Sequence, residues 1–130
     1  MPKFATIVIS HDLLQTVFGG AKNVYPKETI LLLRGEKKKD TIIVTELVVP
    51  PLANYGRGFS SIPLHMMPMD FSIVGTAHSH PSGNLKPSHT DMNHFFGPIL
   101  MIVGFPFTDE KNVAVYNRKE ERLALQVTKP

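Results

Sequence analysis

The residues with the clearest chemical potential lie in the run from His78 to Asp91, which reads His-Ser-His-Pro-Ser-Gly-Asn-Leu-Lys-Pro-Ser-His-Thr-Asp. His78 and His80 follow a segment, 71–77, whose β-branched residues favour a strand. Strand residues two apart point to the same side of a sheet, so the two imidazoles can converge. Asp91 lies one turn into a helix that is expected to begin at Ser88. Two imidazoles and one carboxylate are protein ligands typical of a catalytic zinc with an open fourth position, so the sequence predicts one zinc per chain.

Simpler explanations exist for each half of this pattern. Histidine pairs occur by chance on exposed strands, and Ser88 with Asp91 ahead of an apolar stretch also fits the N-terminal cap of a helix. Each of these short motifs, considered alone, also occurs in many unrelated sequences. The combination of both halves favours the metal. The chain has no cysteine, which excludes a thiolate-ligated structural zinc site. The remaining histidines lack a comparable spacing argument and are expected outside the metal shell: His11, His65, His89 and His94.

The arrangement His78-x-His80, seven residues, Ser88, two residues, Asp91 resembles the signature of the JAMM (MPN-plus) zinc metalloproteases. That signature also includes a glutamate at the start of an upstream strand that ends in glycine, and the segment from Glu28 to Gly35 is similar to it. Leu31 stands where many members carry a glycine. The resemblance extends over nearly the whole chain. The chain most resembles the compact, stand-alone prokaryotic or archaeal type, which includes desampylases and deubiquitinase-like isopeptidases.

A hydrolytic zinc site needs a carboxylate that takes a proton from water and returns one to the leaving amine. From the residues alone, both Glu28 and Glu46 qualify, because each is associated with an apolar strand. The resemblance implies Glu28 in this role. It also implies that Ser88 holds the oxyanion of the tetrahedral intermediate or orients the water.

The sequence indicates a single α/β domain spanning residues 1–130. The expected order is strand, helix, two strands, strand, helix and three strands, which favours a mixed sheet with helices on its faces. The resemblance implies a curved mixed sheet between helices, in outline similar to the cytidine deaminase fold. Deaminase chemistry is disfavoured because its zinc site needs cysteines. The expected elements are strand 3–9, a helix to about residue 23 capped by Ser10, strands 28–34 and 41–49 joined by a charged turn at 35–40, strand 71–79, helix 88–97, and strands 99–105, 112–117 and 122–127.

Composition narrows the class further. A hydrophobic content of 42% suffices for a core, and no apolar stretch is long enough to span a bilayer. The N-terminal residues lack the layout of a signal peptide, so the cytoplasm is the expected compartment. The net charge of +3 comes without a basic stripe, which argues against nucleic-acid binding. Nothing in the sequence fixes an oligomeric state.

Family members with an intact motif hydrolyse isopeptide or peptide bonds after the C-terminal Gly-Gly of ubiquitin-like proteins. In this chain the Pro- and Gly-rich segment 50–69 is expected to be a long loop, with a possible short strand near 60–64. Its apolar residues would hold an extended tail by β-augmentation; ordinary loop packing is the alternative, and it explains the methionines equally well. The chain lacks the long insertion that larger eukaryotic relatives carry after the Asp-bearing helix, which favours a small ubiquitin-like or sulfur-carrier substrate. The expected tail contacts are Phe59, Ile62, Leu64 and Met66.

Three functions therefore stand at the level of sequence. The first is an isopeptidase that acts on conjugates of a ubiquitin-like modifier. The second is a peptidase that processes the C-terminus of a sulfur-carrier protein. The third, a non-catalytic MPN scaffold, is disfavoured because such scaffolds usually lose metal ligands and this chain retains all of them.

Overall fold

The computed structural model describes residues 4–49, 72–93 and 95–129. Within these ranges the strands and α-helices follow the order predicted from the sequence, with a short 3-10 turn added before the sixth strand. None of the described helices is long and apolar enough to cross a membrane. The elements are β1 (Thr6–Ser10), α1 (His11–Val24), β2 (Ile30–Lys38), β3 (Thr41–Val48), β4 (Ile73–His80), α2 (His89–Asn93), β5 (Ile99–Gly104), η2 (Glu110–Asn112), β6 (Val113–Tyr116) and β7 (Arg122–Thr128).

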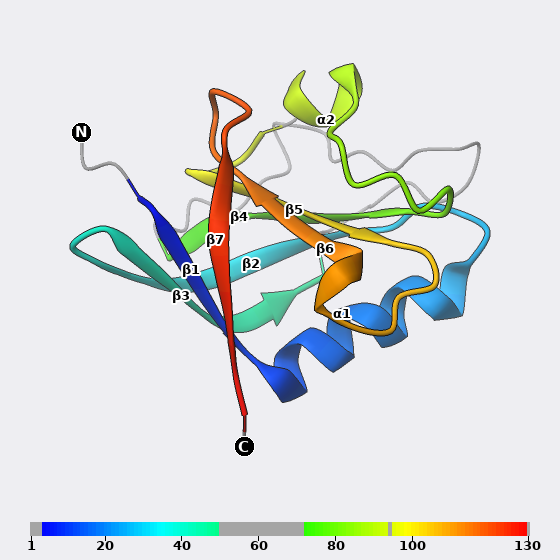
Figure 1. Cartoon of the computed structure of the whole chain (residues 1–130), viewed down its shortest axis with the longest axis horizontal. Helices are drawn as coiled ribbons and strands as arrows, with labels where there is room; N and C mark the ends of the chain where they lie inside the picture. The colour runs from blue at the N-terminus through cyan, green and yellow to red at the C-terminus, as the bar shows by residue number, and fades with distance from the viewer. Residues whose placement is uncertain (1–3, 50–71, 94, 130) are drawn as a thin grey trace.

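The strands form one mixed sheet that closes on itself in the order β1-β3-β2-β4-β5-β6-β7 (Figure 1). The pairs β1–β3, β1–β7 and β4–β5 are parallel, and the other pairs are antiparallel. Closure results from β7, which lies beside β1 in register from Thr6–Ala124 to Ser10–Thr128. The predicted mixed sheet is confirmed, and its curvature continues until the sheet becomes a barrel.

The helices lie on opposite sides of the sheet (Figure 1), as the alternation of side chains along β5 shows. Ile99, Met101 and Val103 belong to the main core, together with the buried face of α1. Leu100 and Ile102 belong to a second cluster, against which Met92 of α2 packs. Because successive strand residues point to opposite faces, β5 separates the two helices. The expectation of a sheet between helices is therefore met.

Helix α1 begins and is buried as the sequence predicts. The hydroxyl of Ser10 accepts a hydrogen bond from the Leu13 N–H at 3.1 Å, which satisfies one of the free donors of the first turn. The buried side chains follow helical spacing and are Leu14, Val17, Phe18 and Ala21. The helix ends at Val24, and the chain then turns toward β2 through Glu28.

Several strands begin two or three residues later than predicted, such as β2 at Ile30, and the largest departures are at a turn and at a helix end. The charged turn expected at 35–40 is only Lys39–Asp40, because β2 continues to Lys38 in antiparallel pairing with β3. Cross-strand hydrogen bonding overrides the low strand preference of consecutive lysines. The helix expected over 88–97 ends at Asn93, ahead of Gly97, which has a φ of 83°. The possible strand near 60–64 lies outside the described residues.

Candidate metal centre

Strand β4 delivers two histidines to one buried place in the structure. It lies between β2 and β5, and all eight of its residues are buried. His78 and His80 are 5% and 8% exposed, and they project from the same side because they are two residues apart. Ser79 between them serves a different purpose, since its hydroxyl accepts a hydrogen bond from the Thr29 N–H at 2.8 Å. The strand thus presents its imidazoles as a pair.

Asp91 joins these two histidines. Its Oδ2 lies 2.8 Å from His80 Nε2, and its Oδ1 lies 3.3 Å from His78 Nδ1. The carboxylate is itself buried, with 6% of the residue exposed. The structure therefore brings together the three side chains that the sequence predicts as metal ligands.

The donor chemistry of this trio fits zinc, which binds imidazole nitrogen and carboxylate oxygen. Among the described residues, no group of three or more acidic or histidine side chains is already arranged around a common cation position. Instead, the Asp91 oxygens lie against the ring nitrogens of His78 and His80.

Ser88 and Asp91 also form the helix cap that the sequence offered as an alternative. The Ser88 hydroxyl accepts a hydrogen bond from the Asp91 N–H at 3.0 Å, and the Ser88 N–H donates to Asp91 Oδ2 at 2.8 Å. This reciprocal pair is the capping-box geometry, with aspartate in the third helical position. The cap and the histidine contacts coexist. The cap orients the carboxylate and so supports the metal interpretation.

The charges of this cluster stabilise one another. Burial opposes ionisation of Asp91, but the hydrogen bond from His80, the charge of His78 and the Ser88 N–H outweigh burial and lower the Asp91 pKa from 3.8 to about 2. Burial likewise opposes the charge on His80, yet the hydrogen bonds to Asp91 and to the Asn84 carbonyl, with the nearby acidic charges, raise the pKa of His80 above 6.5. In the absence of metal, His80 and Asp91 thus form a buried ion pair.

The Asn84 carbonyl fixes the orientation of the His80 ring. His80 Nδ1 lies 2.7 Å from this oxygen, which can only accept, so Nδ1 carries the hydrogen. Nε2 then faces Asp91 and becomes available to a metal once it loses its proton. A backbone carbonyl that holds the second ring nitrogen is a usual support for a metal-binding histidine. The sequence marks a Pro-Ser-Gly-Asn turn here, but it does not reveal which carbonyl faces the ring.

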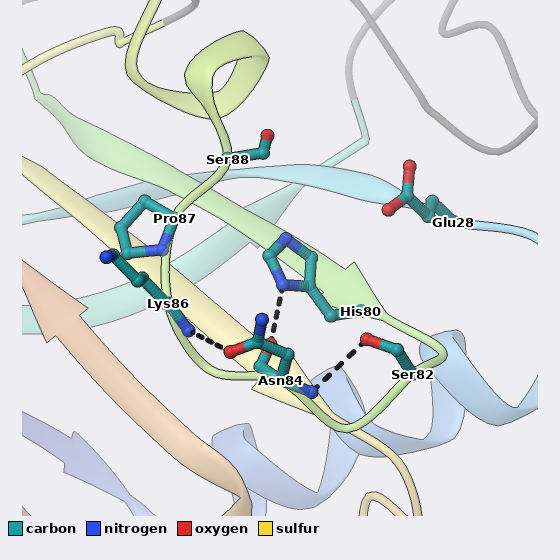
Figure 2. Close-up of a pocket in the computed structure, with 7 residues that line it drawn as sticks. All are labelled: Glu28, His80, Ser82, Asn84, Lys86, Pro87 and Ser88. Carbon is teal, nitrogen blue, oxygen red and sulfur yellow. Dashed lines mark hydrogen bonds between the residues drawn. The ribbon is translucent and has the colours of Figure 1, made fainter.

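Glu28 lies beside this cluster in an open pocket of about 260 Å³ (Figure 2). Figure 2 shows His80 between Glu28 on one side and Ser88 on the other. Burial raises the pKa of Glu28, the charge of His80 lowers it, and the charge of Asp91 raises it further, with a net increase above 4.5. A carboxyl with a raised pKa is suited to taking and returning a proton near neutral pH. The pocket is lined by Glu28, His80, Ser82, Asn84, Lys86, Pro87 and Ser88.

Glu28 precedes β2 rather than lying within it, and its place depends on the adjacent residue. The backbone of Thr29 bonds twice to Ser79, through the Ser79 hydroxyl at 2.8 Å and through the Ser79 N–H at 3.1 Å. Ser79 sits between the two histidines, so the Glu28 segment is fixed directly to β4. Strand alternation directs the Ser79 side chain away from its two histidine neighbours, but the sequence does not reveal its anchoring role.

The competing glutamate has a different environment. Glu46 is exposed on β3 and forms an ion pair with Arg34 at 2.8 Å. Arg34 also donates from Nε to the Ser72 hydroxyl at 2.9 Å. Glu46 does not line the pocket that contains Glu28 and His80. Between the two glutamates that the sequence left open, the geometry favours Glu28.

The other histidines and the predicted tail contacts are distributed as follows. His11 and His89 are exposed and make none of the contacts described for the cluster. His65 and His94 lie outside the described residues. So do the predicted substrate contacts, which are Phe59, Ile62, Leu64 and Met66.

Comparison with known proteins agrees with this geometry. Residues 10–120 match the family described as prokaryotic homologues of the JAB domain. The chain belongs to this family. A relative from Haloferax volcanii, described as a probable metalloprotease, is 31% identical over 106 residues. That match covers 76% of this chain and 66% of the relative, just under two thirds of its length.

Solved structures of JAB-domain proteins share the fold. A JAB1/MPN domain protein from Archaeoglobus fulgidus superposes with a TM-score of 0.67 at 36% identity, over 92% of this chain and 97% of that one. A second structure, described as JAMM, a metalloprotease-like zinc site in the proteasome and signalosome, has a TM-score of 0.67 at 34% identity. It covers 95% of this chain and 98% of its own. The predicted resemblance to the JAMM/MPN fold is thereby confirmed.

Proposed function

We propose that this JAB-domain protein is a zinc metalloprotease that cleaves the bond after the C-terminal Gly-Gly of a ubiquitin-like modifier. One observation carries the proposal: His78, His80 and Asp91 converge beside Glu28 at an open pocket. The descriptions of the relatives as a probable metalloprotease and as a metalloprotease-like zinc site support the same chemistry.

His78, His80 and Asp91 would hold the zinc, and Asn84 would keep His80 oriented toward it. When bound, zinc supplies Lewis-acid polarisation of the scissile carbonyl and makes water more acidic. His80 must give up its Nε2 proton before it can ligate, because the Asn84 carbonyl retains the hydrogen on Nδ1. Before zinc binds, the attraction between the charges of His80 and Asp91 would keep these two proposed ligands close together.

Glu28 would act as the proton carrier. It takes a proton from the attacking water and returns one to the nitrogen of the leaving amine, so that a single carboxyl serves both steps. Because its pKa is raised, the Glu28 carboxyl is better suited both to accept a proton and to give one up near neutral pH. The contact between Thr29 and Ser79 fixes the position of Glu28 relative to β4.

Ser88 would stabilise the oxyanion of the tetrahedral intermediate. Its hydroxyl oxygen accepts from the Asp91 N–H, and this bond uses a lone pair only. The hydroxyl hydrogen therefore remains able to donate into the pocket that Ser88 lines. Capping and oxyanion binding are thus compatible within one side chain. Removing one such donor typically costs about 10²–10³ in rate.

The substrate is proposed to be a folded modifier with a glycine-rich tail. A tail without side chains can approach a site bounded by the 82–88 loop and by Glu28. The assignment of Phe59, Ile62, Leu64 and Met66 to the tail rests on the sequence alone and remains a prediction. Processing of a sulfur-carrier protein would use the same residues and differs only in the group that leaves.

The test is a cleavage assay with matched glutamate variants. The purified protein is incubated with Gly-Gly isopeptide conjugates, linear Gly-Gly fusions of a modifier or sulfur carrier, and an unstructured peptide, with and without a chelator. We expect Gly-Gly substrates to be cut only in the absence of chelator. Glu28→Gln should lose about 10²–10⁴ in rate while it retains zinc. Glu46→Gln, which alters the exposed ion pair, is the control and should remain active.

The pattern of cleavage distinguishes the alternatives. Preference for linear fusions over isopeptide conjugates would favour the sulfur-carrier peptidase. Equal cleavage of the unstructured peptide would refute the Gly-Gly substrate class. Zinc binding with no cleavage of any substrate would leave only a metal-binding scaffold.

A further inference from the structure

Helix α2 is too short to hold its own position. It has five residues, from His89 to Asn93, whereas isolated helices need about 12–15 residues to be even marginally stable in water. Yet α2 carries Asp91, whose two oxygens must meet two histidines. The cap at Ser88 fixes the start of the helix, but it does not fix the helix to the sheet. Besides the Asp91 contacts with β4 and the packing of Met92, contacts on either side of α2 contribute to that attachment.

Tyr116, the last residue of β6, holds the segment before α2. Its hydroxyl donates to the Leu85 carbonyl at 2.8 Å. Leu85 directly follows Asn84, whose own carbonyl accepts from His80 Nδ1. Tyr116 is 9% exposed, and Leu85 and Met92 pack against the hydrophobic cluster that contains it. The Tyr116 hydroxyl therefore fixes the Leu85 carbonyl, which is adjacent in the chain to the Asn84 carbonyl that orients His80.

Arg118 holds the segment after α2. Its guanidinium carbon lies 5.1 Å from the centroid of the Phe95 ring, in a cation–π geometry. Its Nη2 also donates to the Phe95 carbonyl at 3.3 Å. Phe95 comes four residues after Asp91 and is 9% exposed. Two contacts from one arginine thus attach the chain just beyond α2 to the end of β6.

We propose that Tyr116 and Arg118 are positioning residues for the metal site. They lie two residues apart, and through Leu85 and Phe95 they attach the chain on both sides of α2 to the end of β6 and the turn that follows it. Tyr116 acts on His80 through Asn84, and Arg118 acts on Asp91 through Phe95. Neither side chain touches the proposed metal ligands. The predicted effect on zinc binding rests on the proposed function. The predicted effect on the order of the segment around α2 rests on the fold alone.

The first experiment uses metal-free protein, so it does not depend on the proposed function. Amide hydrogen exchange is measured over residues 81–96 in Tyr116→Phe and Arg118→Ala. The controls are Tyr25→Phe, an exposed tyrosine, and Arg122→Ala, which removes a bond to a carbonyl in β6. We expect exchange in 81–96 to become about 2- to 12-fold faster in the two test variants, as for the loss of a single hydrogen bond. The controls should exchange like wild type.

The second experiment measures zinc affinity by competition with a chromophoric chelator, together with kcat and KM. Tyr116→Phe and Arg118→Ala should each bind zinc about 10-fold more weakly, at the lower end of the effect of residues that support metal ligands. At saturating zinc, kcat should fall while KM stays unchanged, since the contacts lie away from the substrate. The controls should match wild type.

The outcomes separate the two claims. Unchanged exchange over 81–96, or unchanged zinc affinity in both test variants, would overturn the positioning role. If the wild-type protein binds no zinc, the proposed function is refuted. Faster exchange in the test variants would then show that the two residues are structural supports only. Faster exchange with weaker zinc binding in the test variants supports the inference.

Discussion

Replacing Asp91 with asparagine tests whether the proposed ligands are already preorganised in the absence of metal. Asparagine preserves the shape of the side chain but cannot carry its charge. In the native protein, that charge accepts from His80 at 2.8 Å and from the Ser88 N–H at 2.8 Å, and it faces His78 at 3.3 Å. Asp91→Asn therefore removes the ionic part of the cluster and leaves most of its packing.

The magnitude follows from the Asp91 pKa, which is about 2 in the folded protein against 3.8 ordinarily. This difference corresponds to about 2 kcal/mol of extra stabilisation of the ionised form. The raised pKa of His80 reports the same interaction and is not added to this figure. Because the Asp91 pKa is lowered on folding, its contribution is fully present above pH 3.8 and is lost as pH falls through about 2.

The assay is urea unfolding of metal-free wild type and Asp91→Asn at pH 6 and at pH 2. At pH 6 His80 is protonated, because its pKa is raised above 6.5. The variant should be about 2 kcal/mol less stable at pH 6, and the gap should shrink below about 0.5 kcal/mol at pH 2. An equal gap at both pH values, or no gap at pH 6, would refute the ion-pair reasoning.

A matched control separates the cluster from the helix. Asp12 is an exposed aspartate in the first turn of α1, and so it shares the helix-terminus position of Asp91 without the histidines. Asp12→Asn should cost no more than about 1 kcal/mol, the usual effect of a charge near a helix N-terminus. A loss as large as that of Asp91→Asn would indicate that the histidines contribute little.

The remaining predictions concern packing, the cap, the anchor of the glutamate segment and the metal. Gly75→Ala should destabilise the protein by about 3 kcal/mol in urea unfolding, because its Cβ would collide with a backbone carbonyl of β5. Ser88→Ala should cost about 1 kcal/mol of unfolding free energy through the lost cap, and its turnover should fall well beyond what that loss explains. Ser79→Ala should cost about 1–3 kcal/mol in urea unfolding, because it removes the acceptor of a buried backbone N–H. Zinc should raise the Tm of metal-free wild type and of His89→Ala in thermal scans, but not that of His80→Ala.

Local patterns were sufficient to predict that His78, His80 and Asp91 converge. The convergence of His78 and His80 follows from strand alternation, and the position of Asp91 follows from a cap three residues earlier. The start of α1 at Ser10 is predicted for the same reason, since capping and apolar spacing act within a few residues. These features are determined by neighbours in the sequence, and so a single sequence reveals them.

Other features depend on distant partners, so the residues alone leave them open or miss them. The choice of Glu28 over Glu46 came from the family resemblance and not from local patterns. Glu28 and Glu46 differ only in what the folded chain places around them, a pocket for one and Arg34 for the other. The extension of β2 to Lys38 depends on hydrogen bonds from β3. The support of the 81–88 loop by Tyr116 comes from a strand about thirty residues away, with no periodic mark in either segment. Such pairings become visible only in three dimensions.

The parallel pairing of β1 with β7 has a mechanical consequence. Because the two strands run in the same direction, a force applied through the two ends of this sequence pulls β1 and β7 in opposite directions along their common axis. The register from Thr6–Ala124 to Ser10–Thr128 is then loaded in shear, so its hydrogen bonds share the load and do not open one after another. The chain should therefore resist stretching from its ends more strongly than stretching across antiparallel β6 and β7, where pairs can separate sequentially. A molecular machine that unfolds this domain from one end would have to overcome the sheared pair first.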